Sequence, residues 1–200
     1  MTLKNKFGLN AKQLEAVNHK DGPILIAAGA GSGKTKTLTS RIANLIELGV
    51  GPENILAITF TNKAAKEMKN RIGNIENIFV GTFHSFGAKV LRQEHLYLQR
   101  TANFTIFDED DSLSLLKQAM KNLNLSKDKH NPLVLKSYIS KIKSELLDSD
   151  KSTVEGALFE EYENFLKRNN AFDFDDLIEK PIKLFNSEKK ILKKYQDQYH

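Results

Sequence analysis

The octapeptide AGAGSGKT at residues 28–35 decides how the rest of this 200-residue sequence is interpreted. An apolar run at residues 23–28 leads into it and predicts a short buried strand, and apolar residues at helical spacing follow from residue 34. Small residues between a strand and a helix let consecutive backbone N–H groups turn toward one phosphate, and the helix adds the positive end of its dipole. The stretch therefore predicts a phosphate-binding loop.

The side chains of this loop predict how a nucleotide would be held. We expect Lys34 to reach the β- and γ-phosphates and the Thr35 hydroxyl to hold Mg²⁺. These two are the candidate catalytic residues, and ATP and Mg²⁺ are the expected cofactors. Ala28 stands where the strict pattern has Gly, which is a mild departure because alanine is small. The expected nucleotide-contacting residues of the loop are Ala28, Gly29, Ala30, Gly31, Ser32, Gly33, Lys34, Thr35 and Lys36.

Strand and helix signals alternate through the first half of the chain. After the loop a helix is expected to end at Gly49, and strands are expected at 55–60 and 78–82. Thr61 or Asn62 can cap the helix that follows the first of these strands. Strands and helices in this order predict a parallel sheet covered by helices.

From about residue 103 the pattern changes to helices joined by polar breaks. Asp108 is expected to cap one helix, Pro132 to open a second, and Ser152 or Thr153 to cap a third. The second half therefore predicts a mostly helical subdomain.

Composition limits the classes of partner. The absence of cysteine excludes disulfides and Cys-ligated metals and favours a cytoplasmic protein, and no apolar run is long enough to enter a membrane. Residues 1–100 carry fourteen Lys/Arg against seven Asp/Glu, whereas residues 101–200 carry sixteen against eighteen. An anionic partner is therefore expected in the first half.

Three further segments narrow the choice among proteins with phosphate-binding loops. Gln13 lies in the stretch LNAKQLEAV at residues 9–17, and a side-chain amide can both donate to and accept from the N6/N7 edge of adenine. The segments TFTNKAAKEM at 59–68 and VGTFHSFG at 80–87 each include the end of a predicted strand and the residues after it. Both segments should lie at the carboxyl edge of the sheet, where ligands bind.

Together with FDFDDLI at residues 172–178, these ordered motifs resemble the UvrD/Rep/PcrA-type DNA helicases of superfamily I over nearly the whole chain. The resemblance implies a RecA-like P-loop NTPase fold, a partial parallel sheet with an inserted, mostly helical subdomain. Residues 1–102 would form the first part of the ATP-binding domain 1A, residues 103–171 the helical subdomain 1B, and residues 172–200 the return to 1A. The implied activity is that of an ATP-dependent helicase that translocates on single-stranded DNA, 3′ to 5′, in DNA repair or replication.

The same resemblance implies that Gln13 contacts adenine and that the two post-strand segments contact single-stranded DNA, with partly duplex DNA as a further partner. Phenylalanines near a strand edge can stack on bases, and the neighbouring polar side chains can bond phosphates. Packing of each Phe in the core and a solvated lysine face are the alternatives. The expected DNA-contacting residues are Phe60, Thr61, Asn62, Lys63, Thr82, Phe83, His84 and Ser85.

An acidic strand end that polarises the attacking water is expected in such a motor. Residues 104–109 fit it only superficially, because helix capping explains Asp108. The acids of residues 173–176 are interpreted as a cap and a solvated helix start, with Pro181 kinking or restarting the helix that follows. By the resemblance the true motif would come just after residue 200. The sequence is then an N-terminal fragment that lacks its C-terminal half and is inactive alone.

Two other interpretations stay open at this point. The chain could be the helicase portion of a recombination-type helicase–nuclease, whose early motifs are similar. It could also be a non-catalytic module that binds nucleic acid or another protein, although the intact loop argues against a decayed ATP site.

Overall fold

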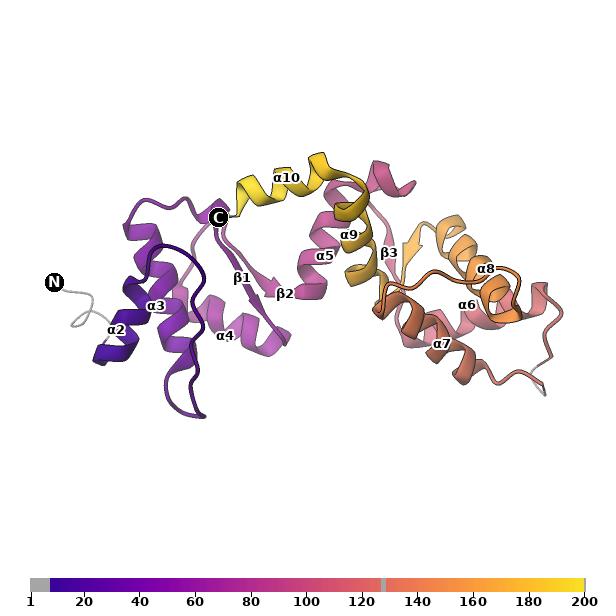
Figure 1. Cartoon of the computed structure of the whole chain (residues 1–200), viewed down its shortest axis with the longest axis horizontal. Coiled ribbons are helices and arrows are strands. Elements are labelled where there is room, and N and C mark those ends of the chain that lie inside the picture. The colour runs from indigo at the N-terminus through magenta and orange to yellow at the C-terminus, as the bar shows by residue number, and fades with distance from the viewer. Residues whose placement is uncertain (1–7, 127–128, 200) are drawn as a thin grey trace. The chain divides into compact units, whose positions relative to one another are not determined.

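A computed structural model describes residues 8–126 and 129–199 (Figure 1). The chain folds into two compact units. The first unit comprises the described residues up to 82 together with those from 194, and the second unit comprises the described residues between 83 and 193.

The structure is mixed α/β, as expected, with mostly helices and two small parallel sheets. The first unit contains α2 (Ala11–Asn18), α3 (Lys34–Glu47), a 3-10 turn (Pro52–Asn54), β1 (Leu56–Thr59), α4 (Asn62–Ile72) and β2 (Phe79–Thr82). The second contains α5 (Phe83–Gln93), a 3-10 turn (His95–Leu98), β3 (Thr105–Ile106), α6 (Glu109–Asn122), α7 (Pro132–Ser144), α8 (Val154–Arg168), β4 (Ala171–Phe172) and α9 (Asp176–Ser187), and α10 (Lys189–Gln198) runs from the second unit into the first. None of the helices in the described ranges is both long and apolar enough to span a bilayer.

The sheet of the first unit is formed by β1 and β2, which pair in parallel from Leu56 opposite Phe79 to Thr59 opposite Thr82 (Figure 1). Helices α3 and α4 pack against each other, and α4 also contacts both strands. Their buried apolar side chains form one core, which consists of Ile42, Ile55, Ala57, Met68 and Val80. The predicted parallel order of these two strands is confirmed.

The strand predicted at residues 23–28 is not formed, and this part of the sequence analysis was wrong. The backbone between α2 and α3 carries no strand, and the Leu25 side chain is 95% exposed instead of buried. A strand is stable only where its backbone N–H and C=O groups bond to a neighbour. Within the described residues the first sheet consists of β1 and β2, and the apolar run pairs with neither strand.

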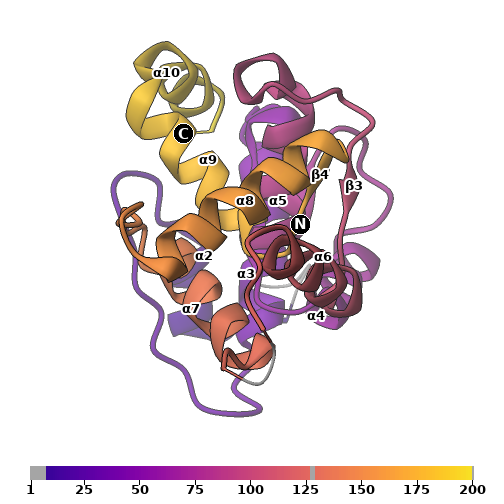
Figure 2. The same ribbon diagram turned by 90° about the vertical axis from the view of Figure 1, so that its right-hand side faces the viewer.

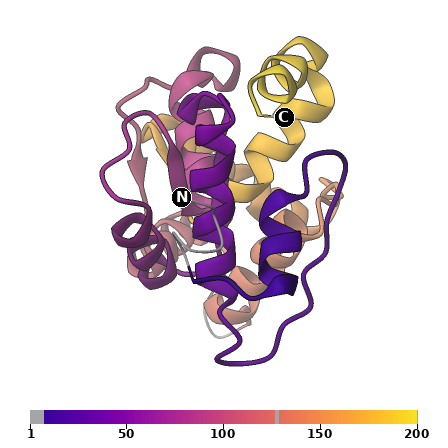
Figure 3. The same ribbon diagram turned by 90° about the vertical axis from the view of Figure 1, so that its left-hand side faces the viewer.

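Helix α2 lies beside α3 (Figure 3). Two side chains of α3 fix it there. Arg41 donates to the Ala16 carbonyl at 3.0 Å, and Asn44 donates to the Val17 carbonyl at 3.0 Å. These bonds satisfy carbonyls at the C-terminus of α2, where intrahelical partners run out.

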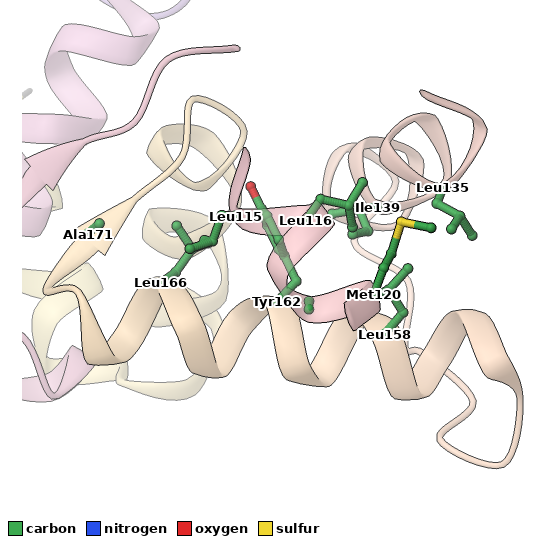
Figure 4. Packing of buried hydrophobic residues seen from close by; sticks show 10 residues of the cluster. Leu115, Leu116, Met120, Leu135, Ile139, Leu158, Tyr162, Leu166 and Ala171 are labelled. Atoms are coloured by element: carbon green, nitrogen blue, oxygen red, sulfur yellow. The ribbon is translucent and has the colours of Figure 1, made fainter. Parts of the chain in front are cut away.

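The core of the second unit lies between α6, α7 and α8 (Figures 2 and 4). Tyr162 and Leu166 on α8 lie among side chains of α6, and Leu135 and Ile139 come from α7. The predicted caps are confirmed, because Asp108 accepts from the Asp111 N–H, Thr153 accepts from the Gly156 N–H, and α7 begins at Pro132.

Helices α5 and α9 pack closely at a glycine. A Cβ atom added at Gly87 would lie 1.7 Å from the Leu177 carbonyl oxygen, so no larger residue fits without separating the helices. Helix α9 continues through Pro181.

The acidic turn before α9 is buried, not solvated as the sequence predicted. Asp173 is 5% exposed and Asp176 is fully buried, because both contact Lys143 of α7. The ammonium of Lys143 also lies 2.7 Å from Glu163 of α8. Buried carboxylates need such a partner, since an unpaired buried charge is very costly.

Burial and pairing set the pKa values of this cluster. Burial alone would lower the pKa of Lys143, but the surrounding carboxylates raise it well above its ordinary value. Burial by itself raises the pKa of Glu163, but Lys143 and Lys180 outweigh it and lower the pKa from 4.5 to about 2. Burial raises the pKa of Asp176 from 3.8 to about 7, although Lys143 lies 2.8 Å away.

The shift of Glu163 predicts a pH dependence of stability. Because the pKa of Glu163 is lowered in the folded state, its contribution is complete above pH 4.5 and is lost as the pH falls through about 2. Glu163→Gln should therefore lower the free energy of unfolding by about 2–3 kcal/mol at pH 6, and the difference from wild type should shrink toward pH 2. Urea unfolding at several pH values measures this.

Glu145→Gln, at an exposed position of the same unit, serves as the control and should leave the pH profile unchanged. A difference between Glu163→Gln and wild type that stays constant from pH 6 to pH 2 would contradict the assigned role of the ion pairs.

Candidate nucleotide-binding site

The glycine-rich loop enters α3 through left-handed backbone. Gly31 has φ +73° and Gly33, the N-cap of α3, has φ +87°. Only glycine adopts such angles without strain. No side chain caps the N–H groups at the start of α3, so the first-turn amides remain available to an anion.

The ammonium of Lys34 is held by the loop itself. Its Nζ donates to the carbonyl of Ala28 at 2.9 Å and to that of Gly29 at 2.7 Å. The Ser32 hydroxyl also donates to the Gly29 carbonyl, at 2.7 Å. The loop therefore holds a positive charge close to its own backbone. The phosphates of a nucleotide could replace these carbonyls as acceptors for the Lys34 ammonium.

Gln13 reaches the loop from α2. Its Nε2 donates to the Ser32 carbonyl at 3.0 Å, and its Oε1 accepts from the backbone N–H of Asn10 at 3.0 Å. The Asn10 side chain in turn accepts from the Gln13 N–H, which completes a capping box. The sequence analysis missed Asn10, although the Asn-x-x-Gln spacing is the signal of such a box.

A hollow of about 310 Å³ lies between α2 and the loop. This volume is at the lower end of the range typical of small-molecule sites. Its lining combines polar and apolar side chains: Asn10, Lys12, Gln13, Ala16, Ile26, Ala27, Ala28, Gly29, Ser32, Lys34 and Thr37. Gln13 and Lys34, which lie twenty-one residues apart in the chain, thus face one hollow.

The remaining predicted loop residues have less direct roles in this geometry. Thr35 lies half-buried in the first turn of α3, and Ala30 is exposed. Lys36 donates to the Gly8 carbonyl at 2.8 Å, so its ammonium is engaged away from the loop.

The residues after β1 and β2 follow strands that end at the same edge of the sheet, since Thr59 lies opposite Thr82. After β1, Phe60 is 92% exposed, so packing in the core is excluded for it. Thr61 caps α4 by accepting from the Ala64 N–H at 3.1 Å, and Asn62 and Lys63 are exposed. Thr82 is buried at the end of β2.

The next predicted residues begin the second unit. Phe83 is 58% exposed and Ser85 is also exposed. The ring of His84 stacks on that of Phe174, with centroids 4.0 Å apart and planes 21° apart. Burial lowers the pKa of His84 below 6.5, although Asp175 opposes the shift.

Known proteins resemble this chain over most of its length. Residues 9–200 match the family model described as the UvrD/REP helicase N-terminal domain. The chain is 43% identical to the ATP-dependent DNA helicase PcrA of Bacillus subtilis, over 96% of the chain and 28% of that protein. It is 42% identical to a probable DNA helicase II homolog of Rickettsia conorii, over 96% of the chain and 32% of that protein. The chain therefore spans about a third or less of these relatives.

The geometry at Gly33 predicts a sensitive position. An alanine Cβ there would lie 2.8 Å from Gln13 Nε2 and would impose a left-handed backbone on a non-glycine residue. Gly33→Ala should weaken binding of ATP by tenfold or more, as measured by calorimetric titration. Gly49→Ala is the matched control, since Gly49 has φ +93° outside the loop with open space around it. Gly49→Ala should lose stability and keep its affinity for ATP. Equal affinities of the two variants for ATP would contradict the assignment of ATP binding to this loop.

Proposed function

The chain belongs to the UvrD/REP helicase family, and from that premise we propose that it forms the ATP-binding part of an ATP-dependent DNA helicase. The observation that carries the proposal is the convergence of the Lys34 ammonium and the Gln13 amide on one hollow beside a glycine-rich loop. A charged group for phosphates and an amide for a base edge are the two elements that recognition of ATP requires.

We assign the roles of the loop residues from their chemistry. The backbone N–H groups of residues 29–35 and the Lys34 ammonium would hold the phosphates, and the Thr35 hydroxyl would hold Mg²⁺ together with phosphate oxygens. The bound metal would neutralise charge that develops on the phosphates. The residues fit the phosphates of ATP, because Lys34 supplies a cation and no side chain caps the N–H groups at the start of α3.

The residues that follow β1 in the first unit and those that follow β2 at the start of the second unit are each proposed to contact DNA. Exposed aromatic rings at Phe60 and Phe83 suit stacking on bases, and Asn62, Lys63 and Ser85 suit bonds to phosphates. Single-stranded DNA, with partly duplex DNA behind it, is the partner that this combination favours.

The proposal for the longer protein goes further. Relatives of which the chain covers 28–32% have names that identify them as DNA helicases. By resemblance the motor is proposed to move 3′ to 5′ on single-stranded DNA in repair or replication, in the cytoplasm. The groups that polarise the attacking water are proposed to lie in the parts of such relatives that this chain does not span. Residues 1–200 alone are then proposed to bind nucleotide without appreciable hydrolysis or unwinding.

Base selectivity tests the nucleotide assignment. The wild-type chain should bind ATP about tenfold or more tightly than GTP, because the Gln13 amide can pair with the N6/N7 edge of adenine but not in the same way with guanine. Gln13→Ala should bring the two affinities within about threefold. The measurement is competition of ATP and GTP for a fluorescent nucleotide.

Asn18→Ala is the matched control, since Asn18 carries an exposed side-chain amide on the same helix and does not line the hollow. It should leave the preference for ATP unchanged. An equal affinity of the wild-type chain for ATP and GTP would reject the adenine role of Gln13.

A further inference from the structure

The turn that precedes α9 has a buried and an exposed side. Asp173 and Asp176 are buried, whereas Phe174 between them is 54% exposed and stacks on His84. One short turn therefore joins a charged cluster in the interior to an aromatic pair at the surface.

The four carboxylate oxygens of Asp173 and Asp176 are divided between two tasks. Asp173 Oδ1 accepts from the Asp176 N–H at 2.9 Å, and Asp176 Oδ2 accepts from the Asp173 N–H at 3.1 Å. These reciprocal bonds close the turn. The other two oxygens, Asp173 Oδ2 and Asp176 Oδ1, accept from the Nζ of Lys143 at 2.7 and 2.8 Å.

Lys143 is thus the group that holds both carboxylates together. Its side chain is fully buried, and it comes from α7, thirty residues before Asp173. Without this ammonium the ionised carboxylates would lose their nearest cation in a buried site, with Lys180 left 3.4 Å from Asp176 Oδ1, so the turn would lose much of what holds this form. The Tyr162 hydroxyl adds a second donor to Asp173 Oδ2 at 2.9 Å.

We propose that Lys143 is a positioning residue, which sets the turn at Asp173–Asp176 so that Phe174 holds the His84 ring in place. The inference rests on the proposal that the residues after β2, His84 among them, contact DNA, since that contact is what makes the position of the ring matter. Lys143 is buried and contacts the carboxylates, so it acts through the turn and not by touching DNA.

The direct test is the NMR signal of the His84 ring in this 200-residue chain. Phe174 stacked at 4.0 Å should shift the His84 ring protons upfield, and Phe174→Leu gives the value without stacking. Lys143→Met should move the His84 signal most of the way to that value. Lys143→Met should also bring the pKa of His84 closer to 6.5, because the ring becomes more exposed to water.

A milder variant covers the case in which Lys143→Met does not fold. Tyr162→Phe removes only the hydroxyl that donates to Asp173, and it should move the His84 signal in the same direction by a smaller amount. A wild-type His84 signal in whichever of the two variants is folded would overturn the proposal.

The matched control is Lys183→Met, which removes an equal charge from a lysine that pairs with Glu179 and has no ion pair with the turn. It should keep the wild-type His84 signal. Lys143→Met should weaken binding of a single-stranded oligonucleotide about fivefold more than Lys183→Met does, by fluorescence anisotropy. Equal losses in the two variants would overturn the functional part of the proposal.

The DNA role of His84 and the positioning role of Lys143 can be rejected independently. Wild-type affinity of His84→Ala for the oligonucleotide would reject the DNA role of His84, whereas the NMR signal still decides whether Lys143 sets the aromatic pair.

Discussion

The left-handed backbone of Gly33 is the constraint on which the candidate site depends. It lets the loop turn sharply into α3, and it leaves the space that the Gln13 amide fills. The turn places Lys34 at the start of the helix, from where its ammonium reaches back to two loop carbonyls. A single backbone conformation thus brings together a helix N-terminus, a cation and a side-chain amide.

Local signals predicted the helices well because each cap needs only a few neighbouring residues. Thr61, Asp108 and Thr153 accept from backbone N–H groups two or three residues into their helices, so the sequence alone reveals them. The parallel pairing of β1 and β2 was also predictable, since a helix between two strands reverses the chain. At the candidate site, Gln13 of α2 bonds to the glycine-rich loop, and its role toward a nucleotide stays a prediction.

Two features could not be read from the sequence because they depend on distant partners. The apolar run at 23–28 has strand composition, but a strand also needs a neighbour, and Leu25 remains exposed without one. Asp173 and Asp176 have the local pattern of a solvated helix start, and only Lys143 on another helix makes their burial possible. The local sequence identifies neither a strand neighbour for residues 23–28 nor Lys143 as the partner of the two aspartates.

Binding of the phosphates of ATP by residues 28–35 can be measured directly by amide NMR. Addition of Mg²⁺ and ATP to the wild-type chain should produce saturable shifts concentrated at residues 29–36 and at Gln13, and Lys34→Ala should lose them at the same concentrations. Shifts of equal size and affinity in Lys34→Ala, or no saturable shift in the wild-type chain, would contradict such binding.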